Sequence, residues 1–280
     1  MTIKIYPSSA AFMVGPLVKT DYNSGCHRFQ WAQAHSGLSK AELHHEINAE
    51  SAALGTLNEY RVAVKLKKDK VKFEREVPFK IAYKDAVISG RQDFVLENGE
   101  VWETKGTGSD KVYKQSILGG VPQLNHVAQL VSYLAFLKKP KGRIVNTYYE
   151  LELDGELESY KVVGERIFTV ECLDDGCIML DQRPYPHTIR DLARWYADLE
   201  KKLADPWTLP QKPCHNGDKF GSPCFSCPLK KVCEKECDVA SFLLQAKEKL
   251  LIPPPPKEFN IKILTARRKV NREKKNAKPT

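Results

Sequence analysis

The sequence feature that most constrains the fold is a β-hairpin pattern in S-G-R-Q-D-F-V-L-E-N-G-E-V-W-E-T-K-G, residues 89–106. Two β-rich stretches flank a turn signal around Asn98 and Gly99, as expected for two antiparallel neighbours. Because side chains alternate along a strand, Glu103 and Lys105 are expected on one face of the second strand. The segment therefore predicts both a sheet and a charged group placed on it.

The turn decides whether Asp93 joins that face. A two-residue turn would pair Asp93 with Thr104 and direct its carboxylate to the opposite face. A three-residue loop with Gly99 in the left-handed conformation would pair Asp93 with Glu103. Both turns are common for such a sequence, and a slip of one residue exchanges every face.

The rest of the chain alternates between helical and β-rich patterns. Helices are expected over 23–37, 39–66, 121–138 and 187–204. Strands are expected over 71–77, 86–96, 100–106, 143–152, 157–163, 166–172 and 177–181. This alternation predicts an α/β fold with a mixed sheet flanked by helices.

Length and composition are those of one large domain with a small appendage, at 280 residues and 42% hydrophobic. The chain contains no run of 18 apolar residues, and residues 1–12 lack the pattern of a secretory signal, so a cytoplasmic protein is expected. After residue 204 the pattern changes to a Pro/Gly/Cys-rich segment, 205–237, and a polyproline spacer follows at 253–256.

Positive charge is concentrated at the C-terminus. The net charge is +9, and residues 257–280 hold nine Lys/Arg against two Glu, which is +7. Such a tail is typically a solvated arm that binds phosphate groups. A second basic stretch, 65–72, is either a solvated strand edge or another DNA contact. The candidate DNA-binding residues are Lys65, Lys67, Lys68, Arg267, Arg268 and Lys269.

Two carboxylates and a lysine on one face of the hairpin are costly to bury in a hydrophobic core, but they suit a metal site. Asp93 and Glu103 supply the hard oxygen ligands that Mg²⁺ or Mn²⁺ prefers. Such an ion lowers the pKa of bound water and neutralises charge on a phosphate, and Lys105 would position or deprotonate that water. This chemistry fits phosphodiester hydrolysis. The same spacing also occurs in solvated amphipathic hairpins, so the motif alone leaves both interpretations open.

A second group of candidate ligands is the C-x2-C-x5-C string formed by Cys224, Cys227 and Cys233. It supplies three thiolates, whereas a tetrahedral zinc site or an iron–sulfur cubane needs four. The spacing does not distinguish zinc from iron–sulfur. Candidates for the fourth ligand are Cys26, Cys214 and Cys237.

Cys26 lies in S-G-C-H-R-F-Q-W, which resembles the amino-terminal cysteine motif of RecB-like PD-(D/E)XK nucleases that carry a 4Fe–4S cluster. This family includes CRISPR-associated exonucleases and AddB-type nuclease domains. The resemblance extends from about residue 24 to 235 and implies a restriction-endonuclease-like sheet whose C-terminal iron–sulfur segment closes onto the N-terminal helix. The implied cluster ligands are Cys26, Cys224, Cys227 and Cys233. The implied domains are a nuclease domain 1–237, a helix and polyproline spacer 238–256, and a basic flexible tail 257–280.

The resemblance also implies the catalytic residues. It assigns Asp93 in G-R-Q-D, Glu103 and Lys105 in E-T-K, and Gln129 and Tyr133 as the Q-x3-Y motif, with Mg²⁺ or Mn²⁺ as cofactor. The Q-x3-Y spacing places both side chains on one helix face. The implied substrate is DNA, chiefly single-stranded ends digested by an exonuclease, and the implied protein partners are of the recombination or CRISPR type.

One position departs from the family pattern. Asn58 replaces a histidine metal ligand in Gly55-Thr-Leu-Asn58-Glu59, which places a second metal or strong activity in question. Glu59 is an alternative ligand. The rival histidines, His44 and His45, fit the spacing less well and are interpreted as helix-surface residues.

Three function classes follow from these patterns. The first is a metal-dependent DNA exonuclease or end-processing nuclease, which the combined motifs favour. The second is a DNA-binding iron–sulfur protein whose nuclease activity is weakened or lost, as Asn58 and the basic tail suggest. The third is a zinc-stabilised interaction protein with a solvated acidic hairpin.

Overall fold

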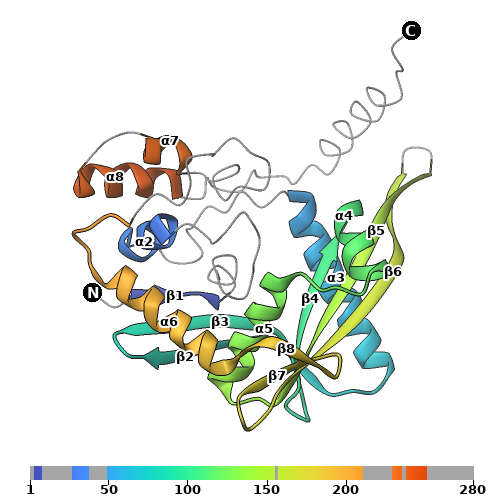
Figure 1. Cartoon of the computed structure of the whole chain (residues 1–280). Coiled ribbons are helices and arrows are strands. Elements are labelled where there is room, and N and C mark those ends of the chain that lie inside the picture. The colour runs from blue at the N-terminus through green and yellow to red at the C-terminus, as the bar shows by residue number, and fades with distance from the viewer. Residues whose placement is uncertain are drawn as a thin grey trace.

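A computed structural model of the chain describes residues 3–7, 27–37, 49–154, 157–210, 229–234 and 238–250. These residues form an α/β structure around one eight-stranded mixed sheet (Figure 1). The strands are β1 Ile3–Ile5, β2 Phe73–Tyr83, β3 Ala86–Leu96, β4 Val101–Thr107, β5 Lys141–Asp154, β6 Leu157–Cys172, β7 Cys177–Leu180 and β8 Arg183–Thr188. The helices are α2 His27–His35, α3 Ala49–Lys68, α4 Asp110–Val112, the π-helix η3 Tyr113–Leu118, α5 Leu124–Leu137, α6 Ile189–Ala204, α7 Lys230–Glu234 and α8 Val239–Leu250.

The strand order is β1-β3-β4-β5-β6-β7-β8, and β2 pairs with β3 along its other edge. β4 and β5 are parallel and are connected through α5, whereas β3 and β4 form an antiparallel hairpin. β1 pairs with the first residues of β3, Ala86 to Ile88, and β4 pairs with Phe94 and Val95 near its end. Asp93 therefore lies where β3 parts from β4, at the opening between two partner strands.

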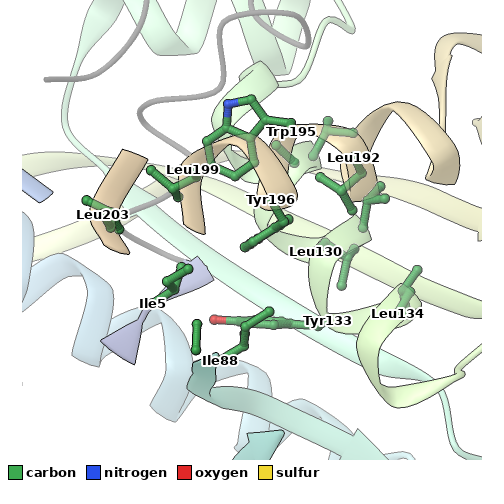
Figure 2. Close-up of a cluster of buried hydrophobic side chains, with 14 of the residues drawn as sticks. Ile5, Ile88, Leu130, Tyr133, Leu134, Leu192, Trp195, Tyr196, Leu199 and Leu203 are labelled. Atoms are coloured by element: carbon green, nitrogen blue, oxygen red, sulfur yellow. The ribbon is translucent and has the colours of Figure 1, made fainter. Parts of the chain in front are cut away.

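The two faces of the sheet have different cores. On one face, Val62 and Leu66 of α3 pack against Phe94, Trp102 and Val145. The other face is covered by α5 and α6, and Figure 2 shows their side chains meeting those of β1 and β3. Figure 2 labels ten residues of this cluster: Ile5, Ile88, Leu130, Tyr133, Leu134, Leu192, Trp195, Tyr196, Leu199 and Leu203. The divided core leaves β4 and β5 between two helices, one on each face.

The predicted central helix is confirmed as α5, Leu124–Leu137. Gln123 at its start is extended, and Lys138 ends it in the left-handed conformation with φ of 51°. Eight consecutive α5 residues, Val127 to Leu134, are buried, which agrees with the apolar run in the sequence. The predicted helix over 187–204 is confirmed as α6, where Thr188 and Asp191 form a capping box.

The expected strands 157–163 and 166–172 are one strand, β6, so the break predicted between them is wrong. Backbone pairing with β5 continues through Gly164. The register shifts where Tyr148 pairs with Gly164 and Tyr149 pairs with Val162, which leaves Val163 as an extra residue in β6. A bulge absorbs an extra residue without ending a ladder, so a local change of pattern does not mark a strand end. In Figure 1, the β5–β6 hairpin projects beyond the rest of the sheet.

The expected segment 238–256 contains a helix, α8, that packs on the rest of the described structure. Phe242 and Ala246 of α8 are buried in the main core. Figure 1 shows α2, α7 and α8 grouped together at one side of the molecule. α8 therefore packs as part of the folded domain.

The predicted helix over 39–66 corresponds to α3, which runs from Ala49 to Lys68. His44 and His45 lie outside the described residues. No helix in the described ranges is both long enough and apolar enough to cross a membrane.

Candidate active site

The hairpin turn has the three-residue form, which resolves the open register. Leu96 donates its backbone N–H to the Glu100 carbonyl at 2.9 Å, and Gly99 has φ of 81°. The ladder pairs Phe94 with Trp102 and Val95 with Val101. Continued by one residue, this register places Asp93 opposite Glu103, as the three-residue alternative predicts.

Asp93 is held at the point where β3 and β4 separate. Its Oδ2 accepts hydrogen bonds from the Thr104 backbone N–H at 2.7 Å and from the Thr104 hydroxyl at 3.0 Å. These bonds replace the next rung of the ladder and fix the carboxylate beside β4. The half-buried Asp93 is thus oriented by the strand that carries Glu103.

Glu103 is the centre of the site and is only 1% exposed. Its Oε1 accepts hydrogen bonds from Lys105 Nζ at 2.5 Å and from Gln129 Nε2 at 2.8 Å. Gln129 Nε2 also lies 2.9 Å from the Tyr133 hydroxyl, so α5 brings both residues of the Q-x3-Y pair to this face. Glu103 Oε2 is buried and has no hydrogen-bond partner among the described residues.

Burial and neighbouring charge alter the acid–base properties of the site. Burial, followed by the charge of Asp93, raises the pKa of Glu103 to about 7. Burial alone would lower the pKa of Lys105, but the charges of Glu103 and Asp93 outweigh it and raise the pKa. Glu103 is therefore a weak acid next to a firmly protonated lysine, and a nearby cation would favour its ionised form.

Glu59, on α3, is a third acid that interacts electrostatically with Asp93 and Glu103. Burial and then the charge of Asp93 raise the pKa of Glu59. Its carboxylate also lies 3.5 Å from Arg75, a surface partner on β2. Glu59 and Glu103 influence each other electrostatically, although they come from different elements.

Asn58, which was expected at the position of a histidine metal ligand, makes its hydrogen bonds elsewhere and not with these acids. Its side chain is completely buried between α3 and β5. Its Oδ1 accepts a hydrogen bond from the Tyr149 hydroxyl at 3.0 Å, and its Nδ2 donates to the Val145 carbonyl at 3.4 Å. Gly106 allows this close approach, because an added Cβ there would lie 2.2 Å from the Leu54 carbonyl oxygen.

Two carboxylates, those of Asp93 and Glu103, are available to hold a divalent metal ion. The unpartnered, buried Oε2 of Glu103 fits a cation, because a buried carboxylate oxygen needs a donor or a metal. Among the described residues, no three His, Cys, Asp or Glu side chains are grouped closely enough to bind one ion. Mg²⁺ commonly takes one or two protein carboxylates and completes its shell with waters and substrate phosphates, so two ligands suffice.

Of the four predicted cluster ligands, one lies in the described part of the chain. Cys26, Cys224 and Cys227 lie outside the described residues, as do the other candidates Cys214 and Cys237. Cys233 lies on α7 and is half-buried.

Three of the six candidate DNA-binding residues lie in the described part of the chain. Lys65, Lys67 and Lys68 form the exposed last turn of α3 and not a strand edge. Lys65 Nζ lies 3.3 Å from Glu165 Oε1 on β6. Arg267, Arg268 and Lys269 lie outside the described part of the chain.

Two further polar residues lie beside Lys105 that the sequence patterns did not indicate. Asn146 on β5 is the residue directly across the parallel ladder from Lys105. His126 on α5 is one turn before Gln129, and the charge of Lys105 contributes to lowering its pKa after burial. The spacing of three from Gln129 could have indicated His126, whereas Asn146 depends on a register that the sequence does not contain.

Comparison with known proteins identifies the family of the chain. The sequence family described as the PD-(D/E)XK nuclease superfamily matches residues 22–234. No curated protein matches the chain in sequence. The alkaline exonuclease LHK-Exo from Laribacter hongkongensis aligns with a TM-score of 0.46 at 16% identity, covering 72% of this chain and 90% of that chain. Its complex with dAMP aligns with the same TM-score and coverage at 15% identity. The crystal structure of SSO0001 aligns with a TM-score of 0.39 at 20% identity, covering 72% of this chain and 76% of that chain. Because the family match covers well over half of the sequence, the chain belongs to the PD-(D/E)XK nuclease superfamily.

Proposed function

We propose that the protein is a Mg²⁺- or Mn²⁺-dependent deoxyribonuclease of the RecB-like type that digests DNA from single-stranded ends. The observation that carries this proposal is the buried carboxylate of Glu103 beside Lys105 and Gln129, opposite Asp93 at the strand opening. A solvated surface hairpin would not bury Glu103 to 1% exposure or give its Oε1 two side-chain donors. Membership of the nuclease superfamily supports the same chemistry.

Each residue has a distinct role in this proposal. Asp93 and Glu103 hold the divalent ion, which when bound activates a water and neutralises charge on the phosphate. Lys105 positions the attacking water and stabilises the negative charge that develops on the phosphate. Gln129 fixes Glu103 through the 2.8 Å hydrogen bond, and Tyr133 in turn contacts Gln129. Glu59 acts through its negative charge and favours cation binding.

Cleavage assays on end-labelled DNA test the proposal. Single- and double-stranded substrates would be incubated with Mg²⁺ or Mn²⁺, using wild type, Asp93→Asn and Glu97→Gln. Glu97 is a matched control, because it lies in the same hairpin but at its tip, paired with Lys72. Nucleotide release by wild type and Glu97→Gln, but not by Asp93→Asn, is expected. DNA binding without cleavage by the wild type would support the alternative of a DNA-binding protein with lost activity.

We also propose that Cys26, Cys224, Cys227 and Cys233 hold a 4Fe–4S cluster that ties the two ends of the nuclease domain together. The packing of the flanking segments supports this proposal. Arg28 donates to the Pro210 carbonyl at 2.8 Å and Trp31 to the Asp205 carbonyl at 2.7 Å, so α2 is bound to the chain that follows α6.

Iron content tests the cluster directly. Cys26→Ala, purified without oxygen, should lose bound iron and visible absorbance. Cys172→Ala is the matched control, because Cys172 lies on β6 and is not among the proposed ligands. Full iron content in Cys26→Ala, with loss in Cys214→Ala or Cys237→Ala, would reassign the fourth ligand.

The basic tail and the lysines of α3 are proposed as DNA contacts. A chain that ends at Pro253 loses the +7 charge of residues 257–280. Its affinity for DNA should fall, and its salt dependence should become weaker, because fewer counterions are released. An unchanged slope of log affinity against log salt would exclude the tail from DNA binding.

A further inference from the structure

Three unpartnered, buried polar groups surround Lys105 on the face of the sheet covered by α5. They are Glu103 Oε2, Nδ1 of His126, and both amide atoms of Asn146, none of which has a hydrogen-bond partner in the described ranges. Asn146 is 2% exposed. Buried polar atoms without partners are rare in folded proteins, so three such groups in one site point to a shared function for them.

The strand register places Asn146 next to Lys105. The two residues are paired across the parallel β4–β5 ladder, so their side chains leave the same face of the sheet. Ile144, two residues earlier on β5, packs in the core on the α5 face, whereas Val145 packs on the α3 face. Asn146 therefore shares the face of Glu103 and Lys105, on the side of Lys105 away from β3.

His126 lies on α5, the helix that covers this face of the sheet. It lies one helical turn before Gln129, which donates to Glu103. Burial, and then the positive charge of Lys105, hold the pKa of His126 well below its ordinary value, so the ring is neutral. A neutral imidazole that carries its proton on Nε2 presents Nδ1 as an acceptor.

The chemistry of these groups matches a lysine ammonium. Lys105 has three N–H donors and no acceptor, and it now donates to Glu103 Oε1. Asn146 Oδ1 and His126 Nδ1 are acceptors without donors in the described structure. A divalent ion bound to Glu103 would repel the ammonium and compete with it for the carboxylate.

We infer that Asn146 and His126 are positioning residues that receive the Lys105 ammonium when Glu103 binds a divalent ion. This inference rests on the proposed metal-dependent nuclease function. The lysine then has two positions, one on Glu103 and one between β5 and α5. In the second position Asn146 and His126 accept two of its three N–H groups, and the third remains for the attacking water or the phosphate. Without the second position, metal binding would leave the partly buried Lys105 ammonium without a protein acceptor beside the bound ion, which would weaken the metal site.

The matched variants are Asn146→Val and Asn146→Thr, which have the same shape and differ by a hydroxyl acceptor. Both residues suit a strand, so folding should be retained, as thermal unfolding would check. Mn²⁺ affinity, measured by titration calorimetry, should fall about tenfold in Asn146→Val and recover partly in Asn146→Thr. Gln33→Leu on α2 controls for removal of a buried amide and should bind Mn²⁺ as wild type does.

A double-mutant cycle separates positioning from general loss of structure. In a Lys105→Met background, Asn146→Val should leave Mn²⁺ affinity unchanged, because no ammonium needs a second place. An equal loss in both backgrounds would overturn the inference, as would wild-type affinity in Asn146→Val. If the wild type itself bound no Mn²⁺, both this inference and the proposed function would fail.

A crystal structure of the wild type with Ca²⁺, an ion that fills oxygen sites, gives a direct test that needs no variant. Lys105 Nζ should then lie within hydrogen-bond distance of Asn146 Oδ1 or His126 Nδ1. A lysine that remained on Glu103, with a buried water filling the space beside Asn146, would overturn the inference.

Discussion

Asn58 and Asn146 are two buried asparagines beside β5, on opposite faces of the sheet, and their surroundings differ. Asn58 is completely buried, and both ends of its amide are hydrogen-bonded, to Tyr149 and to Val145. Asn146 is 2% exposed, and neither end of its amide has a partner among the described residues. The same residue type therefore stabilises the fold on the α3 face and indicates a ligand-dependent site on the α5 face.

The wider surroundings follow the same division. On the α3 face, Arg61 donates to Thr147 at 2.8 Å and also pairs with Glu165, which secures α3 on β5 and β6. On the α5 face, Glu103 keeps a buried oxygen without a donor in the described structure. Arg61 Nε is also buried without a hydrogen-bond partner in the described structure, so the contrast is one of degree. On the α5 face, unpartnered atoms of Glu103, His126 and Asn146 gather around one lysine, whereas on the α3 face most polar groups are paired.

The largest expected effect comes from the acids at the strand opening. Asp93→Asn and Glu103→Gln should each lower the cleavage rate about a thousandfold or more, because the metal supplies several kcal/mol of charge stabilisation. The folded structure should be retained in both, since neither change alters side-chain volume much. Single-turnover cleavage and circular dichroism would measure the two effects. Undiminished digestion by Asp93→Asn would make the acidic hairpin a surface feature.

The next effect distinguishes the neighbouring residues Glu59 and Asn58. Glu59→Gln should reduce Mn²⁺ affinity or activity about tenfold to a hundredfold, as expected for a group that acts through the electrostatics of a metal site. Asn58→His should not raise activity, because position 58 is filled by contacts with β5. It should instead lower stability by about 1–3 kcal/mol through overpacking and lost hydrogen bonds. A gain in Mn²⁺-dependent activity for Asn58→His would reverse this assignment.

A pH effect of about tenfold is expected for metal binding. The pKa of Glu103 is raised to about 7 from 4.5, so the metal-free protein holds a proton there at pH 6 that the metal must displace. Mn²⁺ affinity should therefore rise about tenfold between pH 6 and pH 8, with proton release below pH 7. Calorimetry in buffers of different ionisation enthalpy measures that release.

The same pKa determines how stability without metal depends on pH. Because the folded state keeps a proton that the unfolded chain loses above pH 4.5, this group lowers the free energy of unfolding as pH rises from about 5 to 7. Glu103→Gln should remove that part of the pH dependence. Urea unfolding at a series of pH values would measure it, and an unchanged profile in Glu103→Gln would contradict the assignment.

The smallest expected effect is a loss of stability when the hydrogen bond to Asn58 is removed. Tyr149→Phe removes the donor to Asn58 Oδ1 and should cost about 1 kcal/mol of stability. Cleavage should change little, because Tyr149 faces α3 and lies apart from Glu103. A large loss of activity at unchanged stability would place the α3 face in the catalytic site.

The register of the hairpin illustrates the limit of sequence-based reasoning. The residues 97–99 allow two turns that place Asp93 on opposite faces, and both satisfy the local turn preferences. The apolar side chains of Phe94 and Trp102 bury against α3 only in one of these registers, so packing on a distant helix decides between them. The continuous β6 shows the same effect, since its long pairing with β5 overrides a weak local pattern.

The sequence by itself determined the alternation of helices and strands, the helix that carries Gln129 and Tyr133, and the spacing of Glu103 and Lys105 on one strand face. These features depend on periodicity and local chemistry, which neighbouring residues carry. Only the tertiary structure decided that Asp93 lies opposite Glu103 and that Asn146 and His126 lie beside Lys105. It also decided that the charge of Asp93 acts on Glu59, whereas Asn58 is hydrogen-bonded elsewhere. Those relations join β3, β4, β5, α3 and α5, and contacts between distant segments follow from burial and register, which no local pattern contains.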